Sequence, residues 1–195
     1  GELHIFSDAS FTGYGAVAYR RVVGVDGTVR VAFLNGKAHV VPSNASRSAH
    51  HNSVPRLELV AAAKSIDLMR ALIKSVEGAM TRVWLWTDST SVLGQIRDRT
   101  KKYKAFVENR LSKIDKKSRP DHWNFVDSDK NPADHVSRGL KPNEKEKWKM
   151  YLEGPAFLWT KEEDWPRMKV SREPVEEVVM MKEGDFSCGA VLRFK

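Results

Sequence analysis

The chain has 195 residues, of which 41% are hydrophobic, so it is long enough for one compact domain with a sizeable core and an appendage. Its formal net charge of +8, from 33 Lys and Arg against 25 Asp and Glu, favours a polyanionic partner, although a merely soluble basic surface would have the same charge. The single cysteine, Cys188, excludes an internal disulfide and a cysteine-based zinc site, and favours a reducing compartment.

The chain has no apolar run long enough to cross a bilayer, so we expect no membrane partner. It begins at Gly1 and lacks a signal-peptide pattern. We therefore expect it to be a piece of a longer protein.

The first forty residues predict an antiparallel meander. An apolar strand is followed by a β-rich strand, and an Asp-Gly turn leads into a third strand with alternating stretches, over residues 2–8, 14–23 and 28–40. The segment 42–53, rich in Ser, Asn and His, is typical of a loop.

The middle of the chain predicts helices alternating with two further strands. Helices are expected over 54–76 and over 103–116. Another helix is expected to end at about Arg97, with Thr87-Asp88-Ser89 as its capping residues. A fourth is expected to begin at Asn131-Pro132, with Asn131 as its cap. Short strands are expected over 83–86 and 122–126. This order predicts an α/β fold with a mixed sheet flanked by helices.

Beyond Leu140 the composition changes to charged residues mixed with Trp and Pro, and no strand is expected there. We predict a domain over 1–140 and a C-terminal helical or irregular extension or linker over 141–195, with a linker or partner-dependent segment from about Lys169. Three tryptophans suggest that the extension docks on another surface: Trp148, Trp159 and Trp165.

Four acids stand where a purely structural role is awkward: Asp8, Glu58, Asp88 and Asp134. Each has an ordinary explanation, as a helix cap, a partner of the helix dipole, an ion-pair member or a ligand of turn amides. However, Asp8 and Asp88 both end apolar strands, and parallel neighbouring strands would place them side by side at one sheet edge. Clustered carboxylates repel one another unless cations neutralise them, and oxygen ligands suit a pair of Mg²⁺ or Mn²⁺ ions acting on a phosphodiester.

Four motifs occur in an order that resembles the ribonuclease H domain of reverse transcriptases: FSDAS, LELVAA, LWTDSTSVLGQI and NPADHVSRG. In particular, VPRLEL, TDS and NPADHVSRG are similar to segments of BEL/Pao-type LTR-retrotransposon polyproteins. The resemblance covers about residues 2–140, with a fainter likeness in YLEGPAFLW. It implies a ribonuclease H-like fold with a five-stranded mixed sheet.

The resemblance also implies a function. Asp8, Glu58, Asp88 and Asp134 would be catalytic residues holding two Mg²⁺ ions, with Mn²⁺ as a substitute. The reaction would be hydrolysis of the RNA strand of an RNA/DNA hybrid, leaving a 3′-hydroxyl and a 5′-phosphate. Further implications are a polymerase domain of the same polyprotein as partner and a location in the cytoplasm, within a retrotransposon particle, or in the nucleus.

Substrate contacts are predicted beside these acids. Between Arg97 and Arg119 there are ten Lys or Arg residues and three acids, which is typical of a solvated helix face or of a groove for a nucleic-acid backbone. We favour the groove, with phosphate contacts from Lys101, Lys102 and Lys104. Ser10, Thr12 and Ser89 could bind phosphate or a ribose 2′-hydroxyl, or act only as turn and cap residues.

Two other functions are compatible with the same residues. One is a catalytically inactive nucleic-acid-binding or reverse-transcriptase-supporting module of the same fold. The other is a DNA-directed nuclease, since one fold and metal site serve several reactions. The presence of all four acids favours an enzyme over the inactive module.

Overall fold

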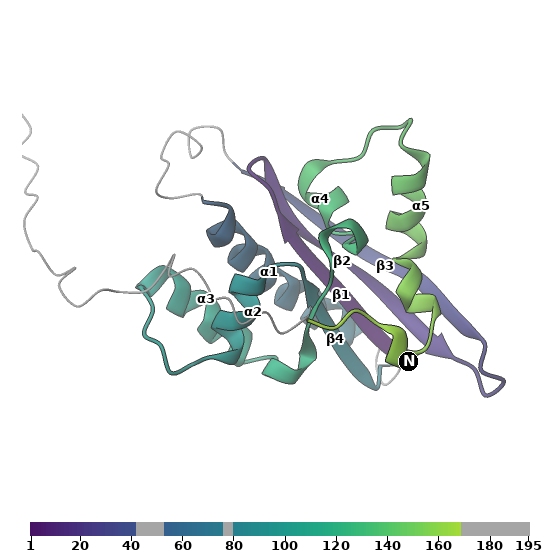
Figure 1. Ribbon diagram of the computed structural model, residues 1–195, viewed down its shortest axis with the longest axis horizontal. Helices are drawn as coiled ribbons and strands as arrows, with labels where there is room; N and C mark the ends of the chain where they lie inside the picture. The colour runs from purple at the N-terminus through teal and green to yellow at the C-terminus, as the bar shows by residue number, and fades with distance from the viewer. Residues whose placement is uncertain (42–52, 76–79, 169–195) are drawn as a thin grey trace, which may run out of the picture.

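The structure is a computed structural model that describes residues 1–41, 53–75 and 80–168 (Figure 1). Nearly all of the predicted loop at 42–53, the predicted segment from Lys169 and the cysteine Cys188 therefore lie outside the described residues. No helix in the described part of the chain is long and apolar enough to cross a membrane.

A five-stranded mixed sheet forms the centre of the molecule, in the order β3-β2-β1-β4-β5, which confirms the predicted fold class. Its strands are β1 (Glu2–Ala9), β2 (Gly13–Val23), β3 (Val29–Val40), β4 (Arg82–Thr87) and β5 (Trp123–Phe125). The meander β1-β2-β3 is antiparallel, as predicted, whereas β4 runs parallel to both β1 and β5.

Helices cover both faces of the sheet (Figure 1). One face carries α1 (Val54–Ser75), α2 (Thr90–Arg97) and α3 (Ala105–Asp115), and the other carries α4 (Asp134–Arg138) and α5 (Lys145–Glu153). Short 3₁₀ turns complete the connections at Pro120–His122, Ser128–Lys130, Ala156–Trp159 and Glu162–Asp164. Alternation along β1 supplies both cores, since Leu3 and Ile5 pack with α1 while Phe6 packs on the opposite side.

The start of α4 differs from the sequence prediction. Asn131 is not the cap of this helix, because the helix begins at Asp134 with Ala133 as its N-cap residue. The Asn131 side chain instead accepts a bond from the Ala133 amide at 3.1 Å and donates to the Ser7 carbonyl at 3.2 Å. The amide therefore closes a local turn and ties it to β1, a long-range partner that local spacing does not reveal.

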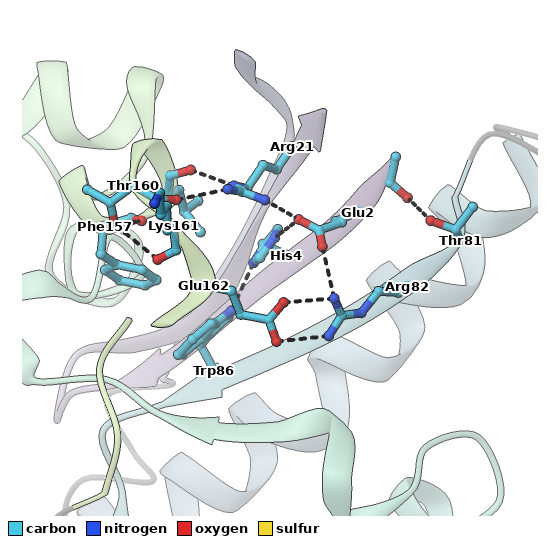
Figure 2. A network of polar contacts seen from close by, with 12 residues as sticks. Glu2, His4, Arg21, Thr81, Arg82, Trp86, Phe157, Thr160, Lys161 and Glu162 are labelled. Carbon is cyan, nitrogen blue, oxygen red and sulfur yellow. Dashed lines mark hydrogen bonds and ion pairs between the residues drawn. The ribbon is translucent and has the colours of Figure 1, made fainter. Parts of the chain in front are cut away.

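The extension packs on the sheet face that carries α4 and α5, and residues 141–168 contain no strand, as expected. Arg21 of β2 is buried, and it donates to the carbonyl oxygens of Leu158 at 2.7 Å and Thr160 at 2.8 Å (Figure 2). Arg82 of β4 forms a two-pronged ion pair with Glu162, with N–O distances of 2.8 and 3.0 Å (Figure 2). The sheet thus holds the backbone and the side chains of the extension.

Aromatic packing reinforces this attachment. Trp165 is only 5% exposed and lies edge-on to His4 at 5.1 Å between ring centroids and to Trp84 at 5.0 Å. Phe157 packs against Trp86 at 5.0 Å. The expected docking of the extension is therefore confirmed for Trp165, whereas Trp159 remains 43% exposed.

Candidate active site

Two of the predicted acids lie side by side at the sheet edge. The parallel register pairs Ser7 of β1 with Thr87 of β4, so the next residues, Asp8 and Asp88, lie next to each other at the ends of adjacent strands. This is the arrangement predicted from two apolar strands that each end in aspartate. It places both carboxylates at the carboxyl edge of the parallel pair.

Asp8 is nearly buried, with 6% of its surface exposed. Its carboxylate accepts a hydrogen bond from the Ser137 hydroxyl of α4. Burial raises the pKa of Asp8 to about 7, and the negative charges of Asp88 and Asp134 add to the rise, although the bond from Ser137 opposes it. Asp88 and Asp134 are therefore both close enough to Asp8 to repel its carboxylate.

Glu58 joins the cluster from α1. Its carboxylate accepts a 2.6 Å hydrogen bond from the Ser89 hydroxyl, and that hydroxyl also caps α2 by accepting from the Val92 amide at 3.2 Å. Burial raises the pKa of Glu58, and the charge of Asp88 contributes to the rise against the bond from Ser89. Ser89 thus connects the helix cap with the acid, and its hydroxyl is engaged by two protein groups.

The remaining two acids have different partners. The Ser128 hydroxyl donates to one oxygen of Asp88 at 2.6 Å, while the buried second oxygen, Oδ1, has no hydrogen-bond partner among the described residues. Asp134 is the first residue of α4 and pairs with Arg138 one turn later. The bond to Asp134 raises the pKa of Arg138, and the charges of Asp134, Asp8 and Asp88 raise it further.

Two glycines allow α4 to reach this edge of the sheet. A Cβ atom at Gly15 would lie 2.3 Å from the Lys37 carbonyl oxygen and 2.4 Å from the Val136 side chain. A Cβ atom at Gly13 would lie 2.7 Å from the Ser137 carbonyl oxygen. Because Gly15 pairs with Asp8, the missing side chain brings α4 against the strand that carries the acid.

These groups suit a hard divalent cation in their chemistry. The donors are all carboxylate oxygens, the class of ligand that Mg²⁺ and Mn²⁺ prefer, and the unpartnered oxygen of Asp88 lies among negative neighbours. As the side chains lie, no group of three or more His, Cys, Asp or Glu residues within 1–41, 53–75 and 80–168 is arranged to hold a metal ion. Each acid is instead turned towards a donor of the chain itself: Ser137, Ser89, Ser128 or Arg138.

Ser10 and Thr12 lie in the turn between β1 and β2, next to this cluster. The Ser10 hydroxyl donates to the Ser137 carbonyl at 2.8 Å and accepts from the Gly13 amide at 3.1 Å, so it closes the turn and ties it to α4. Thr12 is exposed, and its hydroxyl lies 3.0 Å from that of Ser10. The neighbouring Phe11 is 74% exposed, an aromatic ring that the sequence analysis did not single out.

The basic run from Arg97 to Arg119 divides into two kinds of residue. Several cations are engaged within the protein, such as Arg99 with Asp115 at 3.0 Å and Lys113 with Asp67 at 2.6 Å. The predicted contacts Lys101, Lys102 and Lys104 are exposed and lie between α2 and α3. The run from Arg97 to Arg119 therefore does not form one continuous row of available cations, as a single groove for a nucleic-acid backbone would require. Its exposed lysines are separate positions.

The donors that surround the acids were not predicted from the sequence. Arg138 lies four residues after Asp134 on a predicted helix, so its spacing alone could have indicated the pair. Ser137 and Ser128 had no such signal, because they contact acids 129 and 40 residues away in the chain.

Comparison with known proteins gives one family and several similar folds. Residues 1–89 match the family described as the Pao retrotransposon-like RNaseH-like domain, a span that includes Asp8, Glu58 and Asp88 but not Asp134. No curated protein matches the chain.

Among solved structures, the N-terminal RNase H domain of rv2228c from Mycobacterium tuberculosis is 17% identical, with a TM-score of 0.48 over 70% of this chain and 91% of that one. RNase H1 from Halobacterium salinarum is 13% identical, with a TM-score of 0.44 over 70% and 94%. LC11-RNase H1, solved with an RNA/DNA hybrid, is 14% identical, with a TM-score of 0.46 over 69% and 91%. The family match confirms the resemblance predicted from the motifs: over residues 1–89, this chain is similar to the RNaseH-like domain of Pao retrotransposons.

Proposed function

We propose that this chain is a metal-dependent ribonuclease H that hydrolyses the RNA strand of RNA/DNA hybrids during retrotransposon reverse transcription. The observation that carries the proposal is that Asp8 and Asp88 follow paired residues of β1 and β4 at one sheet edge, with Asp134 of α4 near enough to raise the pKa of Asp8 and with an unpartnered buried oxygen on Asp88. Such repulsion costs folding free energy that a bound cation would offset. The family match over residues 1–89 is consistent with this chemistry.

In this proposal, Asp8, Glu58, Asp88 and Asp134 hold two Mg²⁺ ions, for which Mn²⁺ can substitute. When bound, the ions supply an activated water and neutralise charge on the phosphodiester, giving a 3′-hydroxyl and a 5′-phosphate. The chain itself orients the ligands: the hydroxyl groups of Ser137, Ser89 and Ser128 fix one oxygen each on Asp8, Glu58 and Asp88.

The substrate-binding part of the proposal uses three exposed lysines between α2 and α3 and the turn between β1 and β2. Lys101, Lys102 and Lys104 would neutralise backbone phosphates, and Thr12 with Ser10 would meet the sugar-phosphate chain beside Asp8. The polymerase domain of the same polyprotein is proposed as a further partner, in a cytoplasmic particle.

Cleavage of three labelled substrates tests the proposal: an RNA/DNA hybrid, duplex RNA and duplex DNA, each with Mg²⁺, Mn²⁺ or EDTA. We expect cleavage of the hybrid's RNA strand only, dependent on metal, and a loss of at least about a hundredfold in Asp88→Asn, because a neutral amide ligates Mg²⁺ poorly.

The other outcomes separate the alternative functions. Metal-dependent cleavage of duplex DNA would identify a DNA-directed nuclease. Binding of the hybrid with equal affinity by wild type and Asp88→Asn, with cleavage by neither, would support the noncatalytic module and overturn the proposal.

A further inference from the structure

A basic hollow lies between α1 and α3, apart from the acids. Its volume is about 290 Å³, and it is lined by Ile66, Arg70, Asn109, Ser112, Lys113, Lys116 and Lys117. Four of these side chains are cationic, two are neutral hydrogen-bonding groups and none is acidic. The hollow therefore combines positive charge with amide and hydroxyl donors, the usual set for binding phosphate.

The positive charge in this hollow is only partly balanced. Lys113 is neutralised by Asp67 at 2.6 Å. The side chains of Arg70, Lys116 and Lys117 make no ion pair within the described ranges of the chain. Lys116 and Lys117 follow the end of α3, where helix carbonyls favour cations, but Arg70 comes from within α1 and needs a separate reason.

The dimensions suit a strand better than a single phosphate. Asn109 lies on α3 and Lys116 is the C-cap residue seven positions later, which is about 10 Å along a helix. A nucleic-acid strand carries one phosphate per roughly 3.4 Å of duplex axis, so this length has room for more than one phosphate. Arg70 follows Glu58 by twelve residues on α1, so the hollow lies about 18 Å from the acids along that helix, or roughly five nucleotides.

We propose that this hollow binds the phosphodiester backbone of a nucleic-acid strand at a second site, several nucleotides from the carboxylate cluster. The inference rests on the proposed function for the identity of the strand, a member of an RNA/DNA hybrid. Its contribution is sequence-independent and electrostatic, so it extends the footprint on the hybrid without selecting a cleavage sequence.

Salt dependence of binding tests the inference without requiring hydrolysis. The affinity of an 18-base-pair labelled hybrid is measured by fluorescence anisotropy in EDTA over a series of KCl concentrations. We expect Lys116→Gln/Lys117→Gln to reduce the slope of log affinity against log salt by nearly two, since each lost phosphate contact removes about 0.9. Arg70→Gln alone should reduce the slope by nearly one.

The matched control is Lys145→Gln/Lys149→Gln, which removes two exposed charges from α5 on the opposite face of the sheet. Its slope should equal that of the wild type, and unchanged melting temperatures establish that all variants are folded. Equal slopes in the two double variants would overturn the inference. Inorganic phosphate at constant ionic strength should displace the hybrid more readily from the wild type than from Lys116→Gln/Lys117→Gln, because the two ligands compete for the hollow only where it is intact.

The result is distinguishable from failure of the proposed function. If the wild type cleaves the hybrid but the two double variants have equal salt slopes, the second site alone is contradicted. If Lys116→Gln/Lys117→Gln has a reduced salt slope but the wild type cleaves none of the substrates, the ribonuclease proposal alone is contradicted.

Discussion

Asp8 is the residue in which burial and charge conflict most directly, since its pKa is raised to about 7. An unfolded aspartate has a pKa of about 3.9, so between these values the folded protein binds more protons than the unfolded one. The metal-free protein should therefore lose stability as the pH rises from about 4 to 7, by on the order of a few kcal/mol. Urea unfolding in EDTA at several pH values should show a smaller loss in Asp8→Asn than in the wild type, and the part that remains in the variant comes from other acids with a raised pKa such as Glu58.

The control for this measurement is Asp26, an exposed aspartate whose pKa is lowered by hydrogen bonds from Thr28. A lowered pKa makes the folded protein bind fewer protons than the unfolded one, so Asp26→Asn should not remove the loss of stability as the pH rises to 7. An identical pH dependence in wild type and Asp8→Asn would mean that Asp8 titrates normally.

Arg138 would compete with the proposed metal ions, because its guanidinium is bound to Asp134 and its pKa is raised by the charges of Asp8 and Asp88 as well. Removing it should tighten Mg²⁺ or Mn²⁺ binding by about threefold to tenfold, the equivalent of roughly 1 kcal/mol for an exposed ion pair. Titration calorimetry without substrate measures this, and Arg138→Lys should remain near wild type because it keeps the charge.

A second control removes a positive charge elsewhere. Arg119 is paired with Asp121 on an exposed surface, so Arg119→Ala should not alter metal affinity. Weaker metal binding in Arg138→Ala would instead show that Arg138 organises Asp134 as a ligand.

At the scale of elements, the extension acts as the cover of one sheet face. Ending the chain after Leu140 removes Phe157, Leu158 and Trp165, which bury Phe6 and Trp86, and takes away two carbonyl partners of Arg21. We expect chain 1–140 to be insoluble, or destabilised by several kcal/mol in urea unfolding relative to chain 1–168, because buried aromatic surface becomes exposed. This comparison also tests the domain boundary predicted at residue 140.

Two tryptophans of the extension provide a matched pair that tests whether the extension covers this face of the sheet. Trp165→Ala should cost about 3–5 kcal/mol, because Trp165 is nearly buried against the sheet. Trp159→Ala should cost much less, since Trp159 is 43% exposed. A stable, soluble chain 1–140 together with equal costs for the two tryptophans would show that the extension is an independent appendage.

For the molecule as a whole, the sequence predicted what depends on local pattern. Apolar runs identified β1 and β4, and their parallel pairing placed Asp8 beside Asp88 as expected. The helix N-cap at Ser89 could likewise be predicted from the sequence, because a capping hydroxyl bonds to an amide only three residues away.

What could not be predicted depends on partners distant in sequence. Asn131 bonds to β1 rather than capping α4, and Ser137 meets Asp8 only because the whole sheet edge is assembled. The need for Gly15 likewise comes from the Lys37 carbonyl of β3 and from Val136 of α4, which is far along the chain. Such contacts have no local periodicity, so spacing alone does not reveal them.

The hydrogen bond from Arg21 to the Thr160 carbonyl joins residues 139 positions apart, and this separation has a consequence for the order of synthesis. A ribosome adds roughly 5–20 residues per second, so Thr160 follows Arg21 by roughly 7 to 28 s. During that interval β1 and β2 have emerged without the segment that covers their aromatic face. Until the extension has been synthesised, Phe6 and Tyr19 are therefore exposed to contact with other polypeptides. Chaperones ordinarily prevent aggregation through such exposed apolar surface.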